Sequence, residues 1–176
     1  MERPFCLPMK IRPAIANDIP EIAEIYGRSV LEEYASFEHI PPDADEMLER
    51  FNGVVEKGYP YLVAEIDGKV AGYVYASAHR PRPAYQKTVE STVYVAPAYW
   101  RQGVAGALMQ ELIACCRHGE FREMIAIVAC SGDANLDEIG SIRLHRSLGF
   151  VDSGRLKGVG YKHDQWLDIV LLQLSL

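Results

Sequence analysis

The sequence has little positive charge. Its 176 residues contain 18 Lys and Arg against 24 Asp and Glu, which gives a net charge of −6. A surface that binds nucleic acid in general needs clustered Lys and Arg to replace the condensed counterions. We therefore expect no nucleic-acid partner, although a local basic patch would be enough for a small anionic molecule.

Long apolar runs and patterned cysteines are also missing. No stretch approaches the ~20 uncharged apolar residues that a membrane-spanning helix needs, and the first ten residues lack the apolar centre of a signal peptide. The four cysteines, Cys6, Cys115, Cys116 and Cys130, show neither metal-ligand spacing nor a disulfide framework. We expect a cytoplasmic protein with reduced thiols, no membrane segment and no metal site.

What the chain does contain is the composition of a folded domain. Hydrophobic residues make up 49% and charged residues 24%, and the length suits one domain with a substantial core. No internal repeat or linker divides it. We expect a single α/β domain over residues 9–175.

One stretch, Glu90–Met109, changes its hydrophobic period in the middle. Up to Val95 the residues alternate between two sides, as in a strand, and Pro97 ends this pattern. From Val104 the apolar residues recur at helical spacing. The run between strand and helix is Arg101, Gln102, Gly103, Val104, Ala105 and Gly106. It would open the helix and leave the first backbone N–H groups without intrahelical partners.

Such a helix start suits a phosphate group. The free N–H groups and the helix dipole favour negative charge, and Gly103 and Gly106 let a diphosphate approach the main chain. The alternative is an ordinary α/β turn, in which glycine is common. Neither the Gly-x-x-x-x-Gly-Lys-Ser/Thr motif nor the Rossmann glycine motif is present.

Hydrophobic periodicity predicts the remaining elements. They are a strand over residues 9–12, helices starting at Asp18 and Asp43, a hairpin over 61–76 around Asp67-Gly68, a strand over 124–130, a helix within 135–148, and strands over 151–159 and 166–174. Asp18 and Asp43 each precede a glutamate by three residues, as in a capping box. The last strand is almost continuously apolar, which is typical of a central or interface strand.

The strand, the YVAP sequence, the basic glycine turn and the amphipathic helix together resemble the acetyl-coenzyme A motif of the GNAT acyltransferase superfamily. Three stretches closely resemble phosphinothricin and methionine sulfoximine N-acetyltransferases: AYQKTVESTVYV, SIRLHRSLGF and GYKHDQW. The resemblance runs from about Ile11 to Leu174. It implies a GNAT fold, a mixed central sheet flanked by helices and splayed after the fourth strand, and it implies a homodimer.

The resemblance also implies the reaction. Acetyl would pass from acetyl-coenzyme A to the amine of a small amino-acid-like acceptor of the phosphinothricin or methionine sulfoximine type. Two alternatives remain: a GNAT enzyme for another amine, such as a polyamine or a protein N-terminus, and a sensor that binds acetyl-coenzyme A without turnover. The physiological acceptor does not follow from the sequence, because selectivity lies in loops.

The expected acetyl-coenzyme A contacts are Val93, Tyr94, Val95, Arg101, Gln102, Gly103, Val104, Ala105, Gly106 and Asn135. The strand backbone at Val93 to Val95 would pair with the pantetheine arm, as an added strand does. Asn135 is expected to replace an Asn that related sequences carry before SIRLHRSLGF. At the turn, Trp100 stands where the superfamily commonly has Gln or Arg, which removes one side-chain phosphate contact.

Two loops supply candidate acceptor contacts. Phe37 and Glu38 lie in a proline-ended loop that overhangs the acceptor site in the resembled family, although they could instead pack over the core. Arg82 and Tyr85 map onto the family's acceptor-binding loop, and an arginine fork suits a carboxylate or phosphinate. The ordinary alternative for this second loop is a solvated connection.

Two residues are candidates for catalysis. Glu90 is the predicted general base, because a carboxylate on a core strand is costly unless it is partnered or used; the alternative is an ion pair, for example with Arg82. His145 could protonate the leaving thiolate or stabilise the intermediate, since its reference pKa suits proton exchange near neutrality. A histidine that only packs the helix is the alternative.

Overall fold

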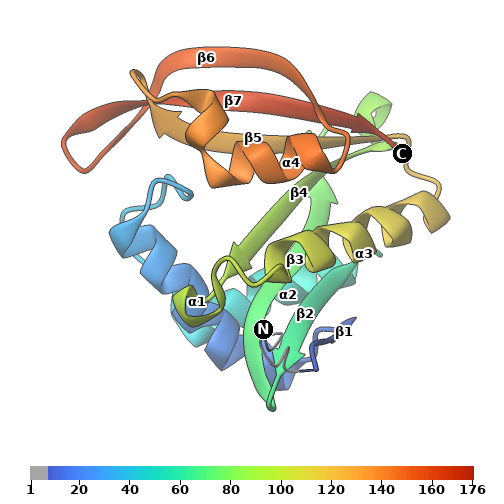
Figure 1. Cartoon of the computed structure of the whole chain (residues 1–176). Helices are drawn as coiled ribbons and strands as arrows, with labels where there is room; N and C mark the ends of the chain where they lie inside the picture. The colour runs from blue at the N-terminus through green and yellow to red at the C-terminus, as the bar shows by residue number, and fades with distance from the viewer. Residues whose placement is uncertain (1–7) are drawn as a thin grey trace, which may run out of the picture.

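Seven strands form one sheet in the computed structural model, which describes residues 8–176. Their spatial order is β1-β2-β3-β4-β5-β7-β6 (Figure 1), and every neighbouring pair is antiparallel except β4 and β5. The strands are β1 (Lys10–Pro13), β2 (Tyr61–Ile66), β3 (Lys69–Ala78), β4 (Thr88–Val95), β5 (Glu123–Ser131), β6 (Val151–Lys162) and β7 (Gln165–Ser175).

Helices cover both faces of the sheet. On one face α1 (Ile19–Glu32) and α2 (Ala44–Val55) pack against β2 and β3. On the other face lie α3 (Val104–His118) and α4 (Gly140–Ser147), where they share the larger core cluster with β3, β4, β5 and β7. Among residues 8–176, no helix is both long and apolar enough to cross a bilayer.

The sheet divides between β4 and β5. These two strands pair in parallel only from Thr88 with Glu123 to Ser91 with Ala126, whereas β4 stays paired with β3 as far as Val95. Beyond Ser91 the two halves of the sheet therefore separate, and α3 lies beside the gap (Figure 1). The predicted mixed sheet, splayed after its fourth strand, is confirmed.

Two local predictions are confirmed in detail. The β2–β3 hairpin turns at Asp67 and Gly68 with φ of 51° and 74°, as a two-residue turn with positive φ at both positions requires. At the start of α2 the Asp43 side chain accepts a hydrogen bond from the Glu46 N–H at 2.9 Å. In both places the interacting residues are neighbours in sequence.

The predicted capping box at Asp18 is wrong. Both carboxylate oxygens of Asp18 bind the guanidinium of Arg12 on β1 at 2.8 Å, and one of them also accepts the Ile15 N–H. Glu21, the expected second member of the box, accepts the Val70 N–H of β3 at 2.9 Å. A buried carboxylate is stabilised more by the two N–H donors of a guanidinium than by one helix N–H, so Asp18 binds Arg12 of β1 instead of capping the helix.

The helix expected within residues 135–148 is confirmed as α4, Gly140–Ser147, and a separate short turn precedes it. Residues Leu136–Glu138 form a separate 3₁₀ turn, and the Asn135 side chain caps this turn by accepting the Asp137 N–H. Ile139 then has extended backbone angles, with φ −73° and ψ 116°, which interrupt the helix before Gly140.

The apolar last strand is central, but it has no free edge. β7 pairs with β5 on one side and β6 on the other, which confirms the predicted central position and leaves no edge for strand pairing with a second copy of the chain. Only the faces of β7 remain for packing.

The three cysteines within the described residues are free thiols. Burial raises the pKa of all three, to about 12 for Cys116, and a thiol in this state is a poor nucleophile. This supports a packing role. Cys6, also expected to be reduced, lies outside the described residues.

The Arg12–Asp18 pair predicts acid sensitivity. Burial raises the pKa of Asp18, but the hydrogen bonds from Arg12 and Ile15 outweigh burial and hold this pKa below its ordinary value. The stabilisation is therefore present above about pH 4, the unfolded value, and is lost as pH falls through the folded pKa. Asp18→Asn should lower the free energy of unfolding at pH 7 by about 1–3 kcal/mol.

Urea unfolding at pH 7 and pH 3 measures this effect. Asp67→Asn is the matched control, because it makes the same change at an exposed turn position where asparagine fits. Equal stability of the two variants at pH 7 would contradict the prediction.

Candidate active site

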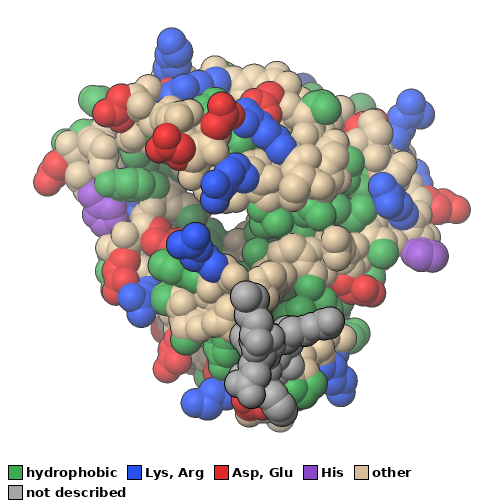
Figure 2. Space-filling view, viewed as in Figure 1, with side chains coloured by type: hydrophobic (Ala, Val, Ile, Leu, Met, Phe, Trp, Pro, Cys, Tyr) green, Lys and Arg blue, Asp and Glu red, His purple; other side chains and the backbone are tan. Residues whose placement is uncertain are grey.

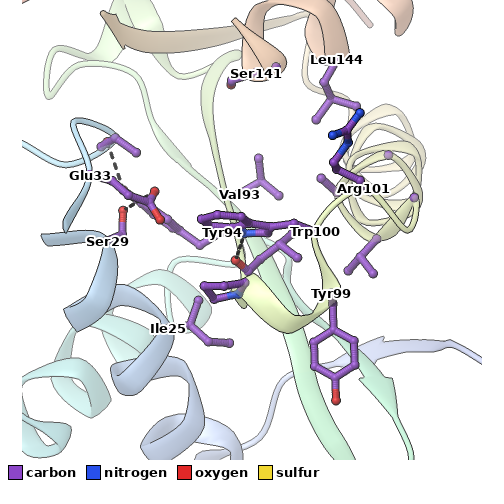
Figure 3. A pocket seen from close by; sticks show the side chains of 18 of the residues that line it. Ile25, Ser29, Glu33, Val93, Tyr94, Tyr99, Trp100, Arg101, Ser141 and Leu144 are labelled. Atoms are coloured by element: carbon purple, nitrogen blue, oxygen red, sulfur yellow. Dashed lines mark hydrogen bonds between the residues drawn. The ribbon is translucent and has the colours of Figure 1, made fainter. Parts of the chain in front are cut away.

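A cavity of about 730 Å³ opens where β4 leaves β5. Its walls come from α1, the end of β4, the turn after it, and the first turns of α3 and α4. Figure 2 shows this face of the molecule hollowed between the two halves of the sheet, with Lys and Arg side chains near the rim. In Figure 3 Arg101 lies at one end of the cavity and Glu33 at the other, with Val93, Tyr94 and Trp100 between them. The space therefore suits an elongated ligand.

The start of α3 forms one end of this cavity. Gly103 has φ +84°, and nothing lies within 4 Å of the position that a Cβ would take there. At Gly106 the nearest atom to such a Cβ is Leu144 Cδ1, at 3.8 Å. The Ala107 N–H donates to Gly103 O at 3.0 Å, so the three N–H groups before it lie ahead of the first helical hydrogen bond. This end of the cavity has the chemistry of an anion site.

The end of β4 turns part of its backbone toward the gap. The Ala96 N–H donates to Ala71 O of β3, so the alternate residues Val93 and Val95 direct their backbone groups to the opposite side. The Val95 carbonyl accepts a hydrogen bond from Trp100 Nε1 at 2.7 Å (Figure 3). Trp100 thus ties the turn to the strand, in place of the phosphate contact that Gln or Arg commonly makes there. The Val93 backbone and the Val95 N–H face the gap.

Arg143 also lines this cavity, although the sequence patterns did not point to it. It lies in the first turn of α4. A signal was available, because the helix dipole opposes a cation in the first turn unless negative charge lies nearby. Arg28, Arg101 and Arg143 thus place three cations on the walls of the cavity.

A second cavity of about 340 Å³ adjoins the first. It contains the two predicted catalytic residues, Glu90 and His145. The residues that line both cavities are Glu33, Ala35, Val93, Tyr94 and Ser141. The two spaces therefore meet where the strands separate, and a ligand in one can reach a ligand in the other.

Glu90 has a partner that the sequence did not suggest. Its Oε1 lies 2.7 Å from Nδ1 of His79, and no ion pair with Arg82 is formed. The ring of Tyr85 packs edge-on against His79 at 5.5 Å, so Tyr85 approaches Glu90 only through this histidine. The register pairs Glu90 with Ser77, two residues before His79, which makes His79 a diagonal neighbour on the same face. That register was not available from the sequence.

His145 is held as a neutral imidazole. It is 3% exposed, and its Nδ1 donates to Ser141 O at 2.8 Å while its ring packs edge-on against Phe150. Burial lowers the pKa of His145, and the hydrogen bond to Ser141 only partly offsets this. Within residues 8–176 no buried side-chain nitrogen or oxygen lacks a partner, and Nε2 makes no protein hydrogen bond. Nε2 is therefore exposed to the second cavity as an acceptor.

All four expected acceptor residues, Phe37, Glu38, Arg82 and Tyr85, lie outside both cavities. The ring of Phe37 packs over Gly160 of β6, where an added Cβ would lie 2.4 Å from it, and Glu38 binds Arg50. Arg82 is exposed at the start of the short turn after β3.

Two expected cofactor side chains also point elsewhere. Asn135 caps its own 3₁₀ turn and donates to Glu138 Oε1. Gln102 donates to Ala98 O at 2.9 Å. Neither lines a cavity, so only the backbone at Gln102 adjoins the anion site.

The segment of residues 33–36, which forms walls of both cavities, is clamped by the β6–β7 hairpin. The buried Nζ of Lys162 donates to the carbonyls of Glu33 at 2.8 Å and Ser36 at 2.5 Å. Gln165 donates to the hydroxyl of Tyr34. Burial lowers the pKa of Lys162, and the two carbonyls compensate for part of its lost hydration.

The described residues contain no cluster of three or more His, Cys, Asp or Glu side chains that could hold a metal ion. An elongated cavity with an anion-binding end, joined to a second space that holds a carboxylate, is suited to group transfer. The fold and the site thus define a transferase that joins a phosphate-bearing donor and a small second molecule.

Comparison with known proteins identifies the class of transferase. Residues 22–150 match the model of the acetyltransferase (GNAT) family. The chain belongs to this family, and the predicted membership is confirmed.

Named relatives narrow the class further. The chain is 46% identical over 166 residues to a phosphinothricin N-acetyltransferase of Alcaligenes faecalis, covering 94% of this chain and 82% of that one. It is 36% identical to an L-methionine sulfoximine/L-methionine sulfone acetyltransferase of Salmonella typhimurium, covering 96% and 95%. A phosphinothricin acetyltransferase of Sinorhizobium meliloti, solved in complex with AcCoA, superposes with a TM-score of 0.89 at 41% identity, covering 96% and 88%. The predicted N-acetyltransferase class is confirmed.

The neutral His145 gives a testable pH dependence. Because its folded pKa is lowered, the unfolded chain binds more protons below about pH 6.5, and stability should fall as pH drops from there through the folded pKa. ¹⁵N NMR at pH 7 should show His145 neutral and protonated at Nδ1. His145→Asn keeps a donor for Ser141 but should lose this part of the pH dependence.

His118→Asn is the control, because it changes an exposed histidine on α3. It should retain the wild-type dependence. An imidazolium signal for His145 at pH 7 would refute the assignment.

Proposed function

We propose that the chain transfers acetyl from acetyl-coenzyme A to the amine of a small amino-acid-like acceptor, of the phosphinothricin or methionine sulfoximine type. One observation carries the proposal: the two cavities meet where β4 and β5 separate, and one ends at the open start of α3 while the other contains Glu90. The acceptors named for the relatives supply the acceptor class.

The first cavity fits acetyl-coenzyme A. We assign its diphosphate to the backbone N–H groups of residues 101–106, where the missing side chains of Gly103 and Gly106 leave room, with Arg101 and Arg143 adding positive charge. The backbone from Val93 to Val95 would pair with the amide-rich arm. When bound, this cosubstrate supplies an activated thioester carbonyl.

The second cavity fits the acceptor's amine. Glu33 and Glu90 both line this cavity, and no Lys or Arg side chain of the described residues lines it. An ammonium group is therefore favoured there. We retain Tyr85 as an acceptor-side residue because its ring abuts His79. For Phe37 and Arg82 as acceptor contacts, and for Asn135 as a cofactor contact, the support is the family resemblance alone.

We assign Glu90 as the general base. An amino-acid amine is largely protonated at neutral pH and must lose a proton before it attacks. The C–N bond then forms and the C–S bond breaks; one proton of the ammonium goes to Glu90 and a second ends on the thiol. Glu90 and Val95 are five positions apart, about 16 Å along a strand, so Glu90 acts on the acceptor or through water.

His145 has a narrower role than the sequence allowed. Its lowered pKa disfavours donation of a proton to the thiolate, whereas its exposed Nε2 can accept a hydrogen bond from the acceptor or from water. We assign it to orienting the acceptor beside Glu90.

We also propose that residues 9–175 form one domain and that two copies of the chain form a homodimer. The face of β5, β7 and β6 opposite α4 carries no helix (Figure 1). Apolar side chains are exposed on it, including Ile127, Leu156 and Val151, which are 45%, 48% and 63% exposed. An uncovered apolar sheet face of this kind is typical of a contact surface.

The reaction predicts a specific loss in Glu90→Gln. This change keeps the shape of the side chain but removes the base, so kcat/KM should fall by roughly 10²–10⁴. The affinity for acetyl-coenzyme A should barely change, and the loss should shrink at high pH, where free amine is abundant. Thiol release from acetyl-coenzyme A, followed with phosphinothricin and methionine sulfoximine from pH 6 to 9, measures this.

Glu24→Gln is the control, because it makes the same change at an exposed position of α1. A Glu90→Gln enzyme with wild-type kcat/KM throughout this pH range would show that Glu90 is not the base. Wild-type protein that binds acetyl-coenzyme A but turns over no amine would favour the sensor alternative.

The cofactor assignment predicts lost binding in Gly103→Glu. The new side chain would enter the space of the diphosphate and repel its charge, so affinity for acetyl-coenzyme A should fall by at least ~10-fold. Gly58→Glu is a matched control, because Gly58 also has positive φ, +79°, and open space but lies at the end of α2. Both variants carry the same backbone strain, and calorimetry should show wild-type affinity only for Gly58→Glu. Equal affinity of both would disprove the assignment.

A further inference from the structure

We infer that His79 is a positioning residue for the catalytic carboxylate: its hydrogen bond keeps Glu90 aimed into the acceptor cavity. This inference rests on the proposed function, in which Glu90 is the base. It concerns a residue that lines neither cavity and so does not touch the substrates.

The geometry of the pair is specific. The Nδ1–Oε1 distance is 2.7 Å, within the range of a charge-assisted hydrogen bond. The two side chains are 17% and 28% exposed, so water competes only partly with this bond. Glu90 lines the cavity while His79 approaches it from the loop side, beyond the end of β3. The bond therefore fixes which oxygen remains free for the acceptor.

The surroundings hold the imidazole in place. The ring of Tyr85 packs edge-on against the imidazole at an interplanar angle of 76°. The guanidinium carbon of Arg80 lies 5.6 Å from the centroid of the Tyr85 ring. The His79 N–H also donates to Thr88 O at 3.4 Å, which continues the β3–β4 ladder past the strand end. A histidine needed only for packing would gain nothing from a nitrogen directed at a carboxylate.

Several ionisable groups face this pair. Tyr85 and Arg80 lie on the loop side, and Tyr75 of β3 is close enough to Glu90 for their charges to interact. Glu33 and His145 face Glu90 across the cavity. The hydrogen bond from His79 Nδ1–H fixes the orientation of the Glu90 carboxylate among these groups.

Two substitutions separate the hydrogen bond from the packing. His79→Phe keeps an aromatic ring against Tyr85 but removes the donor, so the Glu90 carboxylate is no longer held in place and kcat/KM should fall about 10-fold, while the affinity for acetyl-coenzyme A stays at the wild-type value. His79→Asn offers a neutral N–H near the position of Nδ1 and should restore most of the lost kcat/KM. His118→Phe, at an exposed site on α3, is the control and should leave kcat/KM unchanged.

A double-mutant cycle gives the decisive readout. If His79 acts through Glu90, His79→Phe should have almost no further effect in the Glu90→Gln background. The inference is overturned if His79→Phe keeps the wild-type kcat/KM, or if its 10-fold loss persists unchanged in that background. Failure of the proposed function looks different, because Glu90→Gln alone would then leave kcat/KM at the wild-type value.

Discussion

The structure depends on the backbone of two parallel strands that stop pairing. After Ser91 and Ala126 the N–H and C=O groups of β4 and β5 that face each other need other partners, because unpaired backbone groups are costly away from water. Trp100 supplies one partner, at the Val95 carbonyl. The remaining groups face the cavities, where the amide-rich arm of the proposed cosubstrate would supply partners for them.

The gap also has to be kept from collapsing. The segment of residues 33–36 spans it and is bound from both halves of the sheet: Tyr94 of β4 donates to Ala35 O, and Lys162 of β6 donates to two carbonyls of the same segment. A buried ammonium is expensive, and two carbonyl acceptors offset part of that cost. Hydrogen bonds from both halves of the sheet to one loop thus help to set the width of the gap.

The sequence predicted what depends on nearby residues. The Asp67-Gly68 hairpin, the Asp43 cap and the glycine turn before α3 each involve residues within a few positions of one another. Prediction from the sequence failed where a residue distant along the chain or on another element binds the same group, as Arg12 of β1 binds the carboxylate of Asp18. The pairing of His79 with Glu90 required the register of β3 on β4, which no local pattern contains. The resemblance supplied the splayed sheet, but not the loop contacts of this chain.

The place of Trp100 has an optical consequence. The chain has two tryptophans, and the other, Trp166, is 66% exposed on the β6–β7 hairpin and lines neither cavity. The indole of Trp100 is 49% exposed and forms part of the cavity wall, so a bound ligand would displace water from it. Its emission should then move to shorter wavelength as the cavity fills. The side chain that secures the turn therefore also makes the protein its own fluorescent reporter of occupancy, without any attached dye.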